Sequence, residues 1–325
     1  FLICGLKNFQ ATGSIAWVAY GENIDMNKDD LRKLHAVEDH ARDFKNRNYV
    51  YPVISRRAGG LSLGVNLNPN RLCTFDCVYC EVDRSAPLSP AAQKSVIDIP
   101  LLKEELSWLL KQALSGELGK EPKFAQAGDL LQQVRDVSFS GDGEPTLCPD
   151  FPDAVRAVGE VLKEFDLLTT CKVVLITNAT CLHLTSVHEA LDILMSYPHG
   201  EIWAKLDAGT SEYYARMNRS GVPFERILSN LNFISKRIPV YIQSMFLKLN
   251  GQMMSEVELL AYMDRIKNLI DSGGKILGIQ AYTLARPTFA PGLDSLKLSA
   301  LTKVELEALG DQIRKNTGLA VECYA

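Results

Sequence analysis

Between residues 61 and 284, stretches with the pattern of β-strands alternate about six times with stretches of helical periodicity. The expected strands are residues 61–68, 134–140, 172–177, 202–206, 240–247 and 275–283. The expected helices are residues 100–114, 154–165, 185–195, 211–217, 224–234 and 255–270, and Ser255 with Glu258 predicts a capping box on the last. Such alternation predicts an α/β fold of parallel βαβ units. Six units are fewer than the eight of a closed barrel.

The segments on either side of this repeating core have other patterns. Residues 26–60 are expected to form an N-terminal extension with a helix at 29–44 and a strand at 49–55. Residues 285–325 are expected to form a C-terminal extension, with a helix at 301–316 and a short strand at 319–321, that covers the barrel mouth or a sheet edge. Residues 1–25, which begin with Phe1, are interpreted as an irregular arm or an over-long start.

The amino-acid composition indicates which binding partners and which cellular compartment to expect. The chain has 325 residues, 23% of them charged, and a formal net charge of -4, so no broad basic field is expected to attract nucleic acid. The apolar run at residues 15–20 is too short to span a bilayer and lacks the features of a signal peptide. Eight cysteines in a chain of this length do not fit a secreted disulfide framework. A cytoplasmic protein without a membrane partner is therefore expected.

Three of the cysteines crowd into eight residues directly after the first core strand. Cys73, Cys77 and Cys80 form the spacing CxxxCxxC, in a loop position where α/β barrels carry active sites. Thiolates are soft ligands that select Fe–S clusters, zinc or Cu(I). A four-iron cluster normally takes four cysteines, so three would leave one iron with an open coordination position. A Cys₃His zinc site is the alternative, although none of the five histidines lies beside the cysteines at zinc-finger spacing.

The CxxxCxxC motif, with Tyr79 directly before Cys80, resembles the signature of the radical S-adenosylmethionine (SAM) superfamily. The longer string SLGVNLNPNRLCTFDCVYC resembles one branch of it, the Fe–S oxidoreductases related to the wybutosine-synthesising tRNA enzyme. The resemblance covers roughly residues 49–325. It implies a partial (β/α)₆ TIM-like barrel, which agrees with the six units, and a [4Fe–4S] cluster on Cys73, Cys77 and Cys80.

The resemblance also implies SAM-binding roles for other residues. Ser140–Thr146 (SGDGEPT) is similar to the GGEP motif that holds the SAM amino group, and Thr177-Asn178-Ala179 resembles a contact to the ribose or carboxylate. The implied contacts are Tyr79, Gly141, Asp142, Gly143, Glu144, Asn178, Lys205, Asp207, Gln243, and the backbone at Ile279 and Ala281. The residue types also allow structural roles: Glu144 as a helix cap, Tyr79 as a core aromatic and Asn178 as a turn residue.

Membership in this family implies reductive cleavage of SAM to a 5′-deoxyadenosyl radical, which abstracts hydrogen from a substrate. It also implies an electron donor such as flavodoxin or ferredoxin. A small molecule or a peptide is the expected substrate, with its determinants in residues 1–60 and 284–325. Two alternatives stay open: a tRNA-modifying radical SAM enzyme, disfavoured by the acidic composition, and a non-catalytic zinc or Fe–S protein.

Overall fold

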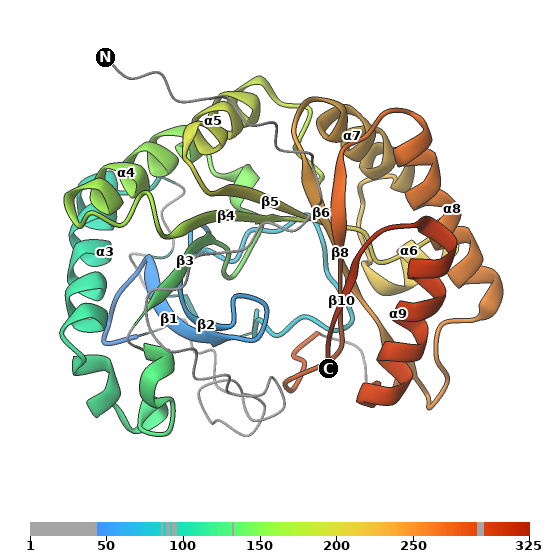
Figure 1. Ribbon diagram of the computed structural model, residues 1–325, viewed down its shortest axis with the longest axis horizontal. Coiled ribbons are helices and arrows are strands. Elements are labelled where there is room, and N and C mark those ends of the chain that lie inside the picture. The colour runs from blue at the N-terminus through green and yellow to red at the C-terminus, as the bar shows by residue number, and fades with distance from the viewer. Residues whose placement is uncertain (1–43, 86, 89–91, 93–95, 132, 291–295) are drawn as a thin grey trace, which may run out of the picture.

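The computed structural model describes residues 44–85, 87–88, 92, 96–131, 133–290 and 296–325. Six parallel strands form the centre of one curled sheet (Figure 1). They are β2 (Gly60–Val65), β3 (Val134–Phe139), β4 (Lys172–Thr177), β5 (Gly200–Lys205), β6 (Val240–Met245) and β8 (Ile276–Tyr282). The expected α/β class and partial (β/α)₆ barrel are confirmed.

Two further strands extend this sheet at its edges. β1 (Val50–Ser55) pairs antiparallel with β2 along its whole length, and β10 (Val321–Tyr324) pairs parallel with β8. The boundary expected between residues 60 and 61 therefore falls at the first residue of β2, and the C-terminal segment adds a strand to the sheet. The edge strands β1 and β10 are not hydrogen-bonded to each other. A side chain connects the segments that follow them, because Arg56 Nη1 donates to the carbonyl of Ala325 at 2.7 Å.

Helices cover the outer face of the curled sheet (Figure 1). They are α3 (Ile99–Leu114), α4 (Phe151–Glu164), α5 (Thr185–Ser196), α7 (Phe224–Arg237), α8 (Glu256–Asp271) and α9 (Lys303–Thr317), and a shorter helix, α6 (Ser211–Met217), follows β5. In α4, Val155, Val158 and Leu162 recur at spacings of three and four and are all buried, because that face packs on the sheet. The core therefore lies between the sheet and the helices.

The inner face of the sheet is polar. Successive strand residues point to opposite faces, so the buried polar residues on the strands share the face that the helices do not cover. These residues are Ser62, Asp136, Ser138, Gln243 and Gln280. Ser244, next to Gln243, points to the helix side, where its hydroxyl lies 2.8 Å from that of Tyr262 in α8. An inner face of this kind leaves room for a polar cavity instead of a close-packed apolar barrel interior.

Several local features differ from the sequence-based expectation. The strand expected at 240–247 ends at Met245, and β7 (Leu247–Leu249) pairs antiparallel with β9 (Leu298–Ala300) in a separate small sheet. Four short 3₁₀ helices were not expected: η1 (Glu117–Lys120), η2 (Pro122–Phe124), η3 (Gly128–Leu131) and η4 (Pro145–Leu147). The arm at 1–25 and nearly all of the helix at 29–44 lie outside the described residues. Among the helices that are described, none combines the length and apolarity needed to cross a membrane.

The capping box expected at α8 forms only in part. Ser255 caps the helix by accepting from Glu258 N at 3.3 Å. The Glu258 side chain does not return to the Ser255 backbone, because it accepts instead from Gly209 N, Thr210 N and Thr210 Oγ1. The carboxylate therefore fixes the loop after β5 rather than closing its own helix.

Candidate active site

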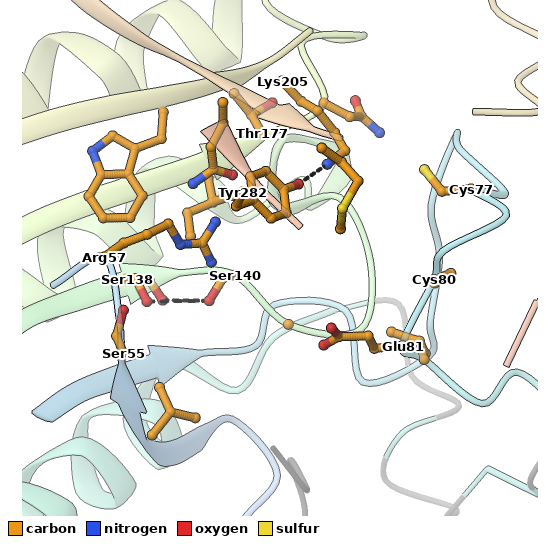
Figure 2. A pocket seen from close by; sticks show the side chains of 18 of the residues that line it. Ser55, Arg57, Cys77, Cys80, Glu81, Ser138, Ser140, Thr177, Lys205 and Tyr282 are labelled. Carbon is orange, nitrogen blue, oxygen red and sulfur yellow. Dashed lines mark hydrogen bonds between the residues drawn. The ribbon is translucent and has the colours of Figure 1, made fainter. Parts of the chain in front are cut away.

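A cavity of about 290 Å³ opens inside the curled sheet and reaches the loop that follows β2. Figure 2 shows this pocket, with Cys77 and Cys80 on one side and Arg57 on the other. Cys73, Cys77 and Cys80 all line it, as do Tyr79, Gly141, Gly143, Glu144, Asn178, Lys205 and Gln243 among the residues predicted from the sequence. The three cysteines and most of the expected contacts thus converge on one space.

The cysteine loop is held against the end of α6. Asp76 N donates to the carbonyl of Asn218 at 2.9 Å, and Val78 N donates to that of Met217 at 2.9 Å. The buried Asn218 amide also donates to the Cys77 sulfur at 3.5 Å. Because these bonds bracket Cys77 on both sides, α6 fixes the position of the buried cysteine of the three. Asn218 was not predicted, since an Asn after a helix has no distinctive sequence signal.

Two arginines strengthen the same loop from outside. Asp76 accepts a hydrogen bond from Arg84 Nη1 at 3.2 Å, and its carboxylate forms an ion pair with Arg219 Nη2 at 2.6 Å. Both guanidinium groups also donate to backbone carbonyls of the loop, Arg84 to that of Phe75 and Arg219 to that of Asp76. Side-chain donors satisfy carbonyls here that no strand or helix pairs, so an irregular loop can hold its shape.

The donor set fits a cluster better than a single metal ion. Within the described part of the chain, no three or more His, Cys, Asp or Glu side chains converge on one ion position. A [4Fe–4S] cluster needs no such convergence, because each thiolate binds a different iron. Burial raises the pKa of Cys77 to about 12, so this thiol is expected to lose its proton only when a metal binds it.

The loop after β3, which contains the GEP sequence, packs directly on the cysteine loop. A Cβ on Gly143 would overlap the carbonyl oxygen of Leu72, and a Cβ on Gly141, which has φ +148°, would overlap the side chain of Asn66. Asn66 Nδ2 in turn donates to Asp142 Oδ2 at 2.7 Å. The two glycines are therefore required for contact between the two loops, and they also line the cavity. The SAM contacts expected for them and for Asp142 stay predictions.

Glu144 is a buried carboxylate with 2% of its surface exposed. Its Oε1 accepts from Thr146 N, Thr146 Oγ1 and Thr177 Oγ1, and its Oε2 accepts from Asn178 N at 2.7 Å. It also caps η4, so the structural role that the sequence allowed is real. Among the described residues no cation pairs with it, Glu144 lines the cavity, and Oε2 accepts one hydrogen bond where a carboxylate oxygen can accept two. A buried anion surrounded only by neutral donors fits an ammonium group from a ligand.

Asn178 combines a turn role with a contact to the cysteine loop. Its Oδ1 accepts from Thr180 N at 3.1 Å, as in a turn, and its Nδ2 donates to Thr74 Oγ1 at 2.9 Å and to the Cys73 sulfur at 3.7 Å. Asn178 lines the cavity, but these contacts occupy much of its hydrogen-bonding capacity.

Lys205 and Asp207 face the interior, as their shared strand face allowed, and they form an ion pair at 3.6 Å. Tyr79 donates to Asp207 Oδ2, and Lys205 donates to the Tyr282 hydroxyl at 2.5 Å (Figure 2). Asp207 Oδ1 accepts from Met245 N at 2.9 Å. The Asp207 carboxylate thus connects the cysteine loop to β6, and Tyr79 is both a buried aromatic and a cavity residue.

The remaining predicted contacts lie in different places. Gln243 lines the cavity and donates to Gln280 Oε1 at 3.0 Å. Ile279 and Ala281 are buried but are not among the lining residues, because they alternate with Gln280 and Tyr282 and point to the helix side of β8.

A family profile described as the radical SAM superfamily matches residues 67–263, more than half of the chain. The chain belongs to the radical SAM superfamily. The resemblance drawn from the cysteine motif is confirmed. The superfamily uses SAM and a [4Fe–4S] cluster. Two features of this chain are compatible with the cluster and with SAM. Three cysteines would leave one iron with an open coordination position, and the Glu144 carboxylate has no cation partner among the described residues.

Two relatives cover much of this radical SAM chain. A protein called GTPase Obg from Brachyspira hyodysenteriae is 23% identical over 288 residues, which are 86% of this chain and 35% of that protein. A UPF0026 protein from Synechocystis sp. is 28% identical over 185 residues, which are 56% of this chain and 57% of that protein. The chain spans about a third of the first relative's length and little more than half of the second's.

Two solved structures are also similar. Streptococcus suis SuiB bound to S-adenosylmethionine aligns with a TM-score of 0.51 and 16% identity, covering 83% of this chain and 52% of that one. TYW1 with a lysine-pyruvate adduct bound, a protein of wybutosine synthesis, aligns with a TM-score of 0.47 and 15% identity, covering 79% and 73%. At this identity the SuiB alignment establishes a shared fold.

Proposed function

We propose that this chain is a radical SAM enzyme that binds one [4Fe–4S] cluster through Cys73, Cys77 and Cys80. When bound, the cluster and SAM supply reductive cleavage of the sulfonium C–S bond and a 5′-deoxyadenosyl radical that abstracts hydrogen from a substrate. The observation that carries this proposal is the convergence of all three cysteines and the Glu144 carboxylate on one cavity.

The residues of the chain have separate tasks in this proposal. The cysteine thiolates hold three irons, and Glu144 Oε2 accepts a hydrogen bond from the SAM ammonium. Asn218 and Tyr79 keep the cysteine loop in place through Asp207. The curled sheet and the loops around the cavity exclude water, which protects a reactive intermediate from side reactions.

The proposed substrate is a small molecule or a peptide, because the net charge of -4 supplies no general attraction for RNA. The proposed electron donor is a one-electron carrier of the flavodoxin or ferredoxin type. None of the seven described cysteines forms a disulfide, and this state fits the reducing cytoplasm.

Anaerobic reconstitution tests the proposal. The wild-type chain should bind about four irons and form 5′-deoxyadenosine from SAM with dithionite. Cys77→Ala should lose SAM cleavage and most of the iron while keeping its fold by circular dichroism. Cys171→Ala is the matched control, since Cys171 is also buried but lies outside the cavity. A colourless protein with one zinc, or SAM cleavage that survives in Cys77→Ala, would refute the proposal.

A further inference from the structure

The cavity has a second end, away from the cysteines. Arg57 lies in the turn between β1 and β2, next to the N-terminal end of β2, whereas the cysteine loop follows the C-terminal end of the same strand. Its side chain reaches into the cavity from that turn (Figure 2). Arg57 therefore approaches the interior from the side opposite the cysteines.

Aromatic rings hold the Arg57 guanidinium in place. Its central carbon lies 5.1 Å from the ring centroid of Tyr282 and 5.8 Å from that of Trp203. Contacts of this kind fix the plane of a guanidinium group and leave its N–H groups available. In the described part of the chain, this guanidinium makes no hydrogen bond and no ion pair, although it interacts electrostatically with the Asp136 carboxylate.

The other two arginines that line the cavity differ from Arg57 in this respect. Arg56 donates to the carbonyl of Ala325 at 2.7 Å, and Arg286 forms an ion pair with Glu81. Arg57 is only partly buried, and its nitrogens are not among the buried polar atoms that lack a partner. Its N–H donors are therefore open to the cavity, where a ligand group that accepts two hydrogen bonds can bind them.

Hydroxyl groups surround the same end of the cavity. The Ser138 and Ser140 hydroxyls lie 3.3 Å apart and Tyr51 hydroxyl lies 3.0 Å from that of Ser140. Beyond them, the Asp136 carboxylate accepts from Ser62 at 2.5 Å and makes no ion pair with Arg57. A guanidinium beside a row of hydroxyl donors is the donor set that proteins use for carboxylates and phosphates.

We propose that Arg57 binds an anionic group, a carboxylate or a phosphate, of a small substrate at the end of the cavity opposite the cysteines. This inference rests on the proposed function, because it names the class of substrate that the same cavity takes. Tyr282, bonded to Lys205, lies between this subsite and Tyr79 of the cysteine loop. A substrate fixed at Arg57 would extend past Tyr282 and bring its other end toward the cysteines.

Binding of charged and uncharged probes tests this subsite. Glycolate and glycerol 3-phosphate are titrated calorimetrically against the full chain, alongside their uncharged analogues ethylene glycol and glycerol, with and without iron and SAM. The anions should bind the wild-type chain at least tenfold more tightly than the analogues. Arg57→Gln should weaken anion binding at least tenfold. Arg57→Lys keeps the positive charge but lacks the paired N–H donors of a guanidinium group, so it should lose part of the affinity.

Arg135→Gln is the matched control, because Arg135 is an exposed arginine on the neighbouring strand and should leave anion binding unchanged. Equal binding of anions by the wild-type chain and Arg57→Gln would overturn the inference, as would a wild-type chain that does not distinguish anions from their analogues.

A measurement on the wild-type chain needs no variant to fold. Phenylglyoxal, which modifies accessible guanidinium groups, should label Arg57 by mass spectrometry, and glycerol 3-phosphate should protect it. Absence of protection would overturn the inference. A chain that binds no iron but still shows Arg57-dependent anion binding would refute the proposed function alone, so the two failures are distinguishable.

Discussion

The backbone N–H of Glu144 donates to the carbonyl of Leu72 at 3.0 Å, which joins the GEP loop to the residue just before Cys73. The two loops follow neighbouring strands, β2 and β3. Through this bond, the group proposed to bind the SAM ammonium and the first proposed cluster ligand occupy fixed relative positions.

Replacement of Gly143 by alanine should separate these loops. The new Cβ would overlap the Leu72 carbonyl oxygen, a backbone atom that cannot move alone. We expect Gly143→Ala to lower the free energy of unfolding by about 2 kcal/mol or more, measured by urea denaturation, and to reduce iron retention. Gly119→Ala is the control, because its Cβ would meet nothing closer than 3.7 Å, and a similar loss in this control would contradict the argument.

Glu144→Gln should weaken SAM binding. The substitution keeps the size of the side chain but removes the buried negative charge, which has no cation partner among the described residues. We expect at least a tenfold rise in the Kd for SAM of the reconstituted chain, equivalent to about 1.4 kcal/mol, by equilibrium dialysis. Glu160→Gln, at an exposed ion pair with Lys103, should leave the Kd unchanged. An unaltered Kd in Glu144→Gln would exclude its proposed role.

Lys205 and Asp207 should depend on each other for stability. Burial opposes the charge of Lys205, but the pKa of its ammonium is nevertheless raised, mainly by Asp207. Lys205→Met leaves the buried Asp207 carboxylate without a cation and should destabilise the chain by about 3 kcal/mol. Adding Asp207→Asn should restore part of that loss. A double variant that shows the simple sum of both single losses would mean that the pair is not coupled.

Asp136 should make stability depend on pH. Burial raises its pKa from 3.8 to about 6, although the hydrogen bond from Ser62 opposes this shift. The folded chain therefore binds the proton more tightly than the unfolded chain, and this residue's contribution to stability rises as pH falls from about 6 toward 4.

Asp136→Asn, which mimics the protonated form, should accordingly stabilise the cluster-free chain at pH 8, by up to about 3 kcal/mol. The difference from the wild-type chain should shrink as pH falls through 6. Urea denaturation at pH 8, 6 and 4 measures it. A difference that does not change with pH would show that the carboxyl is not ionised in the folded chain at pH 8.

The sequence predicts the barrel well because its strands and helices follow simple periodicities. The six parallel strands lie near their expected positions, and α6 matches its expected range of 211–217. The break at Phe246 could not be predicted, because the apolar residues 245–247 give no sign that the chain leaves the main sheet there and pairs with β9, about 50 residues later. The 3₁₀ helices between α3 and β3 were missed for a related reason, since short turns carry little periodic signal.

The candidate site was predicted less completely. The family motif indicates the cysteines and Glu144, but it does not say that Gly141, Gly143 and Asp142 serve contacts between loops. Arg57 could not be predicted as a cavity residue, because a sequence does not show that two aromatic rings from distant strands lie beside it. One signal was present: the alternating Asp136, Ser138 and Ser140 in an expected strand indicate a polar inner face.

The edge strands β1 and β10 do not pair with each other, and this affects how such chains diverge. Because no ladder of backbone hydrogen bonds joins them, either edge strand can be lengthened, shortened or exchanged during evolution while the six central strands keep their partners. Arg57 lies beside one edge, and Tyr324, which also lines the cavity, lies in the other. A lineage could thus acquire a new substrate by altering these margins while the cysteine loop and the six central strands stay unchanged.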